Sequence, residues 1–175
     1  MKKVIMLIMM LLFAGTMICY AEDIAVNDNI TVENFMYAFN NNADAKKEGI
    51  AIVGIVKKAT YNKNINKVIT GYGTNNKVNI MINSDPKTGA IYEIGILGKT
   101  PSNEQELQPI LMTALLVERT IGTPSGDGTV DGMFALIDAY KKGKGTYWCN
   151  TTNRRYIVKT IKVPNIFGFH IQAGI

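Results

Sequence analysis

Residues 77–97 read KVNIMINSDPKTGAIYEIGIL, and this stretch decides the fold. Apolar residues occupy alternate positions from Val78 to Ile82 and again from Tyr92 to Ile96, the pattern of a strand with one buried face. Between the two runs, Pro86 presets a turn dihedral and Gly89 can adopt a positive φ. The stretch therefore predicts an antiparallel hairpin that packs one face against a core.

An apolar helix is predicted directly after this hairpin, over residues 103–121. Ser102–Gln105 has the form of a capping box, in which the serine reaches forward and the glutamine reaches back. Pro109 has no amide proton, so the helix either kinks there or starts again with Pro109 in its first turn. Apolar residues of this helix occupy most of its circumference, which predicts that it packs across the sheet.

The rest of the chain predicts two more helices and several strands. One helix is expected from Val32 to Asn41 with Thr31 as its N-cap, and another from about Val130 to Lys142. An apolar run rich in β-branched residues predicts a buried strand at residues 50–56. Further strands are predicted at residues 67–72, 146–150, 155–163 and 167–172, with Pro164 separating the last two. This order predicts an α+β fold: an antiparallel β-sheet of about five to seven strands with three helices, the apolar 103–121 helix packed on one face.

The amino terminus has the organisation of a signal peptide. Two lysines precede an uncharged run from Val4 to Ala21, and Cys19 and Ala21 supply small residues at the −3 and −1 positions of a cleavage site. We expect residues 1–21 to be removed, which leaves residues 22–175 as a single domain that is periplasmic or secreted.

Two other interpretations of this segment stay open. Val4–Ile18 could be retained as an uncleaved membrane anchor, although the apolar run is short for a membrane span and no basic cluster follows it. Cys19 could carry a lipid, but a lipobox requires a small residue before the cysteine and Ile18 is not small.

The mature domain is only modestly basic. The formal net charge of +5 falls to +3 when Lys2 and Lys3 leave with the signal peptide. Cys149 is then the only cysteine, so no intramolecular disulfide is expected. Such a charge does not establish a nucleic-acid partner, and we expect none in an exported protein. The expected partner is an envelope or extracellular protein or polyanion, with a membrane contacted only through an uncleaved signal segment.

Aromatic and basic residues gather near the carboxyl end and form a candidate ligand-binding surface. Its residues are Tyr147, Trp148, Arg155 and Tyr156. Exposed aromatic side chains beside cations are typical of recognition surfaces. The alternative is that the basic residues of the chain only occupy turns and helix ends.

The acidic segment after Gly122 is a candidate calcium loop. Its possible ligands are Asp127, Thr129, Asp131 and Asp138. Their spacing follows a calcium loop, but threonine and a short aspartate replace the usual ligands at two positions. In a shifted register residues 126–131 resemble the calcium loop of dockerin modules, and Phe134 then takes the place of an acidic ligand. The alternative is an acidic helix N-terminus, and no metal is expected.

Catalytic groups are few. Cys149 and His170 are the only mature cysteine and histidine, so any thiol chemistry would need both. No serine lies in a nucleophile-elbow motif, and no cofactor motif is complete, so no cofactor is expected. The carboxylates that glycoside hydrolysis would need are interpreted as solvated positions: Glu93, Glu104, Glu106 and Glu118.

The hairpin and the helix after it, from about Lys77 to Ile121, resemble a unit of uncharacterised exported bacterial α+β domains. The matching features are the strand at 78–82, the turn Asp85–Gly89, the strand at 91–98 and the apolar helix. This resemblance supports the fold and implies no activity, ligand or catalytic residue.

Since no catalytic motif is complete, we expect an exported non-catalytic binding or interaction domain. The alternative is a small secreted or periplasmic hydrolase whose catalytic residues are scattered in the sequence. Such an enzyme would hold at least two titratable groups within hydrogen-bond reach of each other.

Overall fold

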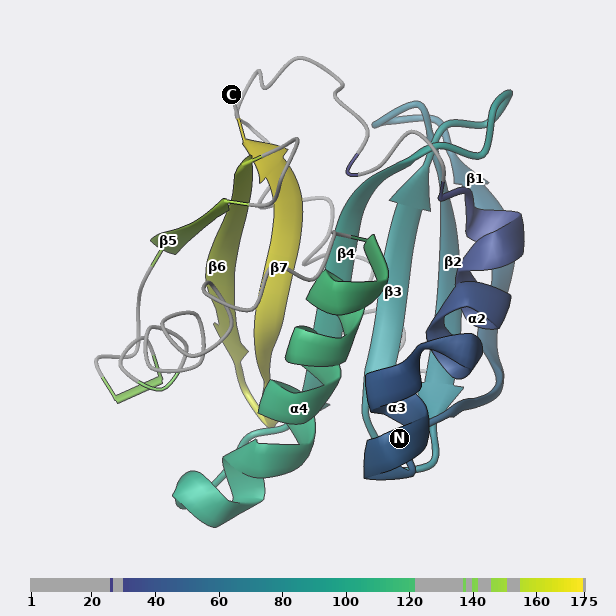
Figure 1. Ribbon diagram of the computed structural model, residues 1–175. Coiled ribbons are helices and arrows are strands. Elements are labelled where there is room, and N and C mark those ends of the chain that lie inside the picture. The colour runs from purple at the N-terminus through teal and green to yellow at the C-terminus, as the bar shows by residue number, and fades with distance from the viewer. Residues whose placement is uncertain are drawn as a thin grey trace.

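The computed structural model describes Val26, residues 30–121, Ile137, Tyr140, Lys141, and residues 146–150 and 155–174. Within this part of the chain, seven antiparallel strands form one sheet in the order β1-β2-β3-β4-β7-β6-β5 (Figure 1). The strands are β1 (Ile52–Asn62), β2 (Lys67–Thr74), β3 (Asn79–Ser84), β4 (Ile91–Lys99), β5 (Thr146–Asn150), β6 (Arg155–Val163) and β7 (Ile166–Gly174). The helices are α2 (Val32–Asn41), α3 (Ala43–Glu48) and α4 (Glu104–Ile121). This arrangement confirms the predicted α+β class.

The hairpin of residues 77–97 is present as β3 and β4. Its turn is closed by the Asp85 carboxylate, whose Oδ1 accepts the N–H groups of Lys87 (2.8 Å) and Thr88 (2.7 Å). Gly89 has a φ of 71°, the left-handed conformation that glycine adopts without a steric penalty. The turn residues therefore act as the sequence predicts.

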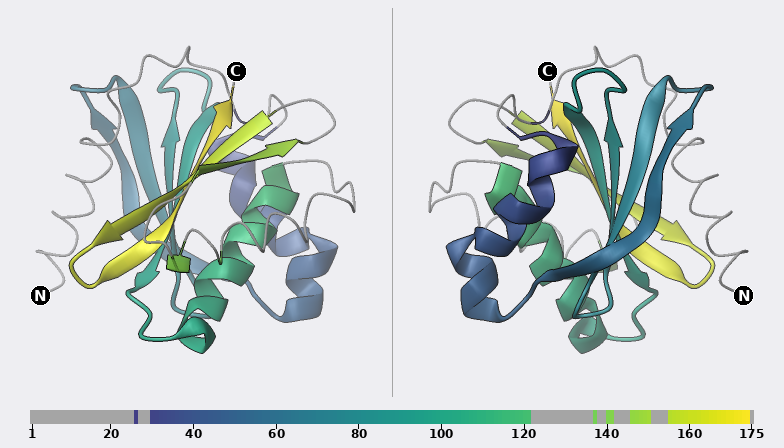
Figure 2. Two further views of the ribbon diagram at one scale, coloured as in Figure 1. Left: turned by 90° about the vertical axis from the view of Figure 1, so that its left-hand side faces the viewer. Right: turned by 90° about the vertical axis from the view of Figure 1, so that its right-hand side faces the viewer.

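Two meanders make up the sheet (Figure 2). The first runs from β1 to β4 and the second from β5 to β7, and antiparallel pairing of β4 with β7 joins them. A two-residue turn links β6 to β7, because Val163 pairs with Ile166. Pro164 and Asn165 occupy its centre, and the φ of 66° at Asn165 is the positive value that the second position of a type II turn requires.

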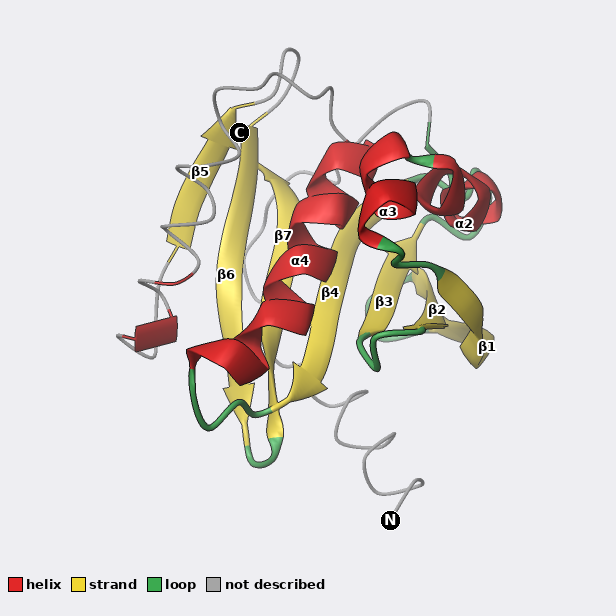
Figure 3. Ribbon diagram, turned by 60° about the horizontal axis from the view of Figure 1, so that its bottom comes forward, coloured by secondary structure: helices red, strands yellow, loops and turns green. Residues whose placement is uncertain are grey.

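The main core lies between the sheet and the described helices, which cover one face (Figure 3). Its members from the helices include Phe35, Phe39, Leu107, Ile110 and Ala114, and its members from the strands include Ile80, Ile82, Ile94, Ile96, Phe167, Phe169 and Ile171. Burying one such side chain contributes roughly 1.5–3 kcal/mol. Helix α4 packs closely on β4 because Gly98 has no side chain: a Cβ there would lie 2.6 Å from Ile110 Cδ1.

Helix α4 begins at Glu104, one residue later than predicted, and its cap is shifted by one residue as well. The side chain of Asn103, rather than that of Ser102, accepts the N–H of Glu106 (2.9 Å). The Glu106 carboxylate in turn accepts the N–H of Ser102 (2.9 Å). Asparagine caps helices as well as serine does, so either residue satisfied the pattern. The helix continues through Pro109 as one element and does not start again there.

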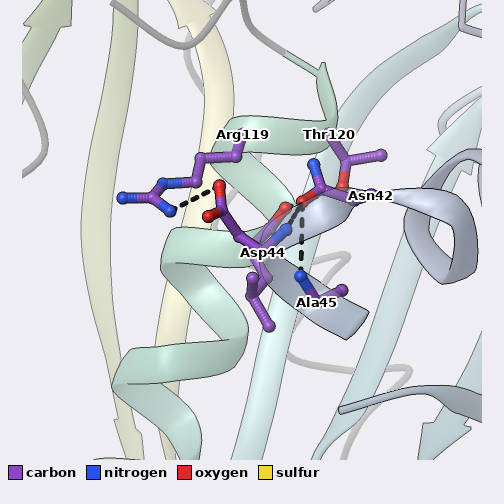
Figure 4. Close-up of polar contacts among 6 residues, drawn as sticks. Asn42, Asp44, Ala45, Arg119 and Thr120 are labelled. Atoms are coloured by element: carbon purple, nitrogen blue, oxygen red, sulfur yellow. Dashed lines mark hydrogen bonds and ion pairs between the residues drawn. The ribbon is translucent and has the colours of Figure 1, made fainter. Parts of the chain in front are cut away.

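Helix α3 was not predicted, and its first turn links it to α4 (Figure 4). The Asn42 side chain caps it by accepting the N–H groups of Asp44 (2.9 Å) and Ala45 (3.3 Å). The Asp44 carboxylate then forms an ion pair with Arg119 of α4, at 2.5 Å between Oδ2 and Nη1. This ion pair thus links α3 to α4.

Several predictions fall outside the described residues. They concern the signal peptide at 1–21, the calcium-loop residues Asp127, Thr129, Asp131 and Asp138, and most of the helix at 130–142. Ile137, Tyr140 and Lys141 of that helix are described, and each is helical. None of the described helices has the length and apolar character needed to cross a membrane.

Candidate functional site

The sheet face opposite the helices carries a polar cluster, which we define as Asn83, Glu93 and His170. Strand alternation places these residues there, since Ile82, Ile94 and the two neighbours of His170 belong to the helix-side core. Asn83 pairs with Glu93 across β3 and β4, and His170 pairs with Gly95 across β4 and β7. Three neighbouring strands therefore bring an amide, a carboxylate and an imidazole together.

Direct contacts hold the polar cluster together. Asn83 Nδ2 donates a hydrogen bond to Glu93 Oε2 (2.8 Å), and His170 Nε2 lies 3.7 Å from Glu93 Oε1. The side chain of His170 is only 6% exposed and that of Glu93 19% exposed. The prediction that Glu93 is a solvated position is therefore wrong, because pairing with β7 encloses it. Glu118 is also buried, whereas Glu104 and Glu106 are exposed as predicted.

The charge of Glu93 is stabilised by its neighbours. Burial raises the pKa of the Glu93 carboxyl, but the nearby His170 imidazole, the hydrogen bond from the Asn83 amide and the charge of Lys67 together lower it below its ordinary value. Lys67 Nζ itself lies 3.7 Å from the centroid of the Tyr92 ring, a cation–π geometry. The carboxylate is thus kept ionised beside an imidazole, an arrangement that can hold and move a proton.

The predicted Cys149–His170 pair is not brought together by the strand register. Cys149 pairs with Tyr156 of β6, and Tyr156 pairs with Ala173 of β7. His170 is three positions from Ala173, so the two Cα atoms are separated by two strands and three residues, roughly 14 Å. Instead, the structure places a carboxylate beside His170. Sequence spacing carried no signal for this contact because 77 positions separate Glu93 from His170.

The predicted ligand-binding residues lie on two paired strands. Trp148 of β5 is paired with Ile157 of β6, and Asn150 with Arg155. Tyr147 and Trp148 are consecutive in β5, and consecutive positions of a strand alternate between the two faces of a sheet. The side chains of Tyr147, Trp148, Arg155 and Tyr156 are outside the described part of the structure, so their role stays a prediction.

The structure reveals a second candidate region that the sequence did not predict, the edge strand β1. It pairs with β2 on one side and, among the described strands, with nothing on the other. It nevertheless carries four large exposed apolar side chains, which we call the β1 surface: Val53 (68% exposed), Ile55 (60%), Val56 (51%) and Tyr61 (55%). Residues 50–56 had been interpreted as a buried strand, and that is wrong for most of them because β1 is an edge strand.

Irregular pairing exposes these side chains. The β1–β2 register shifts between Ile52 and Gly54, and again between Ile55 and Lys57. Such bulges insert an extra residue and redirect its side chain. The Val56 side chain lies over two glycines of β2, since a Cβ at Gly73 would be 2.8 Å from Val56 Cγ1.

Metal binding finds no support in the described residues, where no three His, Cys, Asp or Glu side chains converge. Comparisons of the chain with protein-family models, with curated proteins and with solved structures give no match. The resemblance to exported bacterial domains therefore stays a prediction, and function has to be argued from the polar cluster and the β1 surface.

Proposed function

We propose that this chain is an exported, non-catalytic binding domain that holds an envelope or extracellular partner on the β1 surface. The observation that carries the proposal is the exposure of Val53, Ile55, Val56 and Tyr61 on one edge strand. Single exposed apolar residues are ordinary, but several on one strand usually mark an interaction site. Edge strands are also the elements that proteins normally protect with charges or short length.

The length of β1 strengthens the argument. It spans 11 residues, whereas its partner β2 spans eight. Bulges are one way to keep an edge strand from aggregating, and β1 has them. An edge that is long and apolar, yet bulged, suits selective binding better than indiscriminate strand pairing.

Hydroxyl-radical footprinting tests this proposal. The full chain is oxidised in buffer and in the soluble envelope fraction of its host, and the oxidation of each residue is measured by mass spectrometry. We expect Ile55 and Tyr61 to be protected in the fraction, and exposed Tyr37 of α2 to serve as the internal reference. Equal oxidation of the β1 surface in both conditions would overturn the proposal.

The Glu93–His170 contact favours a second function, a small hydrolase. A carboxylate that orients a histidine is a common way to build a general base, which could activate a water molecule. The test is the hydrolysis of chromogenic ester and amide substrates by the wild type and by His170→Asn. A wild-type activity that His170→Asn abolishes would establish the hydrolase and refute the non-catalytic proposal.

A further inference from the structure

The charge around β1 suggests what kind of partner it binds, given the proposed function. Residues 49–84, which cover β1, β2 and β3, contain five lysines and no aspartate or glutamate. Lys58 lies on β1 itself and Lys63 in the turn that follows, and both are exposed. Lys58 and Lys63 thus place exposed positive charge on β1 and in the turn after it, whereas Lys57 is buried and Lys67 lies against the Tyr92 ring of β4.

Among the described residues, no strand pairs with the outer edge of β1. In an antiparallel sheet, the N–H and C=O groups of successive residues point alternately to the two sides of the strand. At Ile52 the outward pair is already occupied, because Asn40 Oδ1 accepts from Ile52 N (2.8 Å) and Asn40 Nδ2 donates to Ile52 O (3.0 Å). The amide of Asn40 takes the place of a strand at that end. Beyond Ile52, the Thr60 hydroxyl donates a hydrogen bond from Oγ1 to Lys58 O (3.0 Å) within β1 itself.

We infer that β1 binds an extended acidic polypeptide segment as an added strand, starting after Ile52. Strand addition supplies affinity through main-chain hydrogen bonds and specificity through alternate side chains. Apolar residues of the partner would contact Val53, Ile55 and Val56, and its carboxylates would lie near Lys58. Complementary charge both selects the partner and speeds its association.

A pair of synthetic peptides provides the probe. One is a blocked ten-residue peptide of alternating valine and aspartate, and the other has lysine in place of aspartate. Binding of each to the full chain is measured by fluorescence anisotropy at low and at physiological salt. We expect the acidic peptide to bind at least tenfold more tightly, with a difference that shrinks as salt screens the charges. Equal binding of the two peptides would overturn the acidic assignment.

Variants locate the binding to β1. Lys58→Glu is expected to weaken binding of the acidic peptide about tenfold, since it reverses a charge on the strand. The matched control is Lys99→Glu, an exposed lysine on β4 three strands away, which should leave binding within twofold. Ile55→Asp should also weaken binding, with circular dichroism confirming that the variant is folded. Equal loss in Lys58→Glu and Lys99→Glu would reduce the effect to net charge and refute the site.

An N-methylated acidic peptide tests strand addition itself. Methylating alternate amides removes the donors that a strand needs, so binding should be lost if the main chain pairs with β1. Undiminished binding would refute strand addition. Tight binding of anionic lipid vesicles that is abolished by Lys58→Glu would refute the peptide and make a membrane the partner. A dimer that is dissociated by Ile55→Asp would refute the peptide and make a second copy of the chain the partner. Protection of the β1 surface in footprinting without affinity for the acidic peptide would leave the proposed function standing and this inference refuted.

Discussion

The side-chain amide of Asn40 forms two hydrogen bonds with the main chain of Ile52, one as acceptor (2.8 Å) and one as donor (3.0 Å). These bonds attach helix α2 to the edge strand β1. Ile52 is buried, so its N–H and C=O have no easy access to water and depend on this amide. The same contact joins the helical layer to the sheet and closes one end of β1.

Asn40→Ala is expected to lower the free energy of unfolding by about 1–2 kcal/mol, because it leaves a donor and an acceptor of a buried residue unsatisfied. Urea denaturation measures the change. Asn41→Ala is the matched control: Asn41 is exposed, and its amide donates to Tyr37 O within α2 and accepts from the exposed Lys46 ammonium (3.0 Å), so the loss there should stay below about 0.5 kcal/mol. Similar losses of unfolding free energy in both variants would show that the Asn40–Ile52 hydrogen bonds contribute no more to stability than the surface contact of Asn41.

The approach of β7 to β4 gives a second prediction. A Cβ on Gly168 would lie 1.9 Å from the carbonyl oxygen of Ile96, and a main-chain atom in a central strand has no room to move. Gly168→Ala should therefore destabilise the fold by about 3 kcal/mol or more. Gly54→Ala is the control, since a Cβ there meets nothing within 4 Å. Thermal unfolding of the two variants should differ widely; equal melting temperatures would contradict the close packing of β4 and β7.

Local sequence patterns predicted the individual helices and strands better than they predicted which of these elements lie side by side. The alternation from Val78 to Ile82 and the turn Asp85–Gly89 depend on adjacent residues, and both the strand and the turn form as expected. The strand is nevertheless buried on both faces, since Met81 (2% exposed) and Asn83 (0%) are buried as well. The cap of α4 was placed one residue early because Ser102 and Asn103 both have side chains that can cap. Such errors are small, since one hydrogen bond decides between the two.

Contacts between distant segments could not be predicted in this way. Nothing near Glu93 in the sequence indicates that β7 inserts beside β4 and brings His170 within 3.7 Å of its carboxylate. Residues 50–56 have the β-branched composition of a central strand, and only the sheet order reveals that they form an edge. Both candidate regions arise from strand order, which composition does not encode.

The expected signal peptide gives a third prediction. Intact mass of the protein in the soluble envelope fraction should correspond to a chain that begins at Glu22, because cleavage is expected after Ala21. Extracted membranes analysed in parallel provide the control. A full-length chain found only in those membranes would replace cleavage by an anchor at Val4–Ile18 and would place the domain at the membrane surface.

The polar cluster gives the last prediction, a dependence of stability on pH. Burial of Glu93 raises its carboxyl pKa, but the lowering by His170, Asn83 and Lys67 is larger than this rise. The folded-state pKa therefore lies below the unfolded value of about 4.3. The resulting stabilisation is fully present above about pH 4.3 and is lost as the pH falls through the folded-state pKa, because the unfolded chain then binds a proton more readily.

Glu93→Gln should remove this contribution while keeping a side chain of the same size. Urea denaturation from pH 7 to pH 3 should show a gap between wild type and variant that is constant above about pH 5 and narrows below it. Glu104→Gln is the control, because Glu104 is exposed on α4 and its ion pair with Lys141 lies at the surface. A gap that stays constant down to pH 3 would mean that the Glu93 carboxylate gains nothing from His170 in the folded protein. A gap that narrows for Glu93→Gln alone would establish that the imidazole and its partners act on this carboxylate in solution.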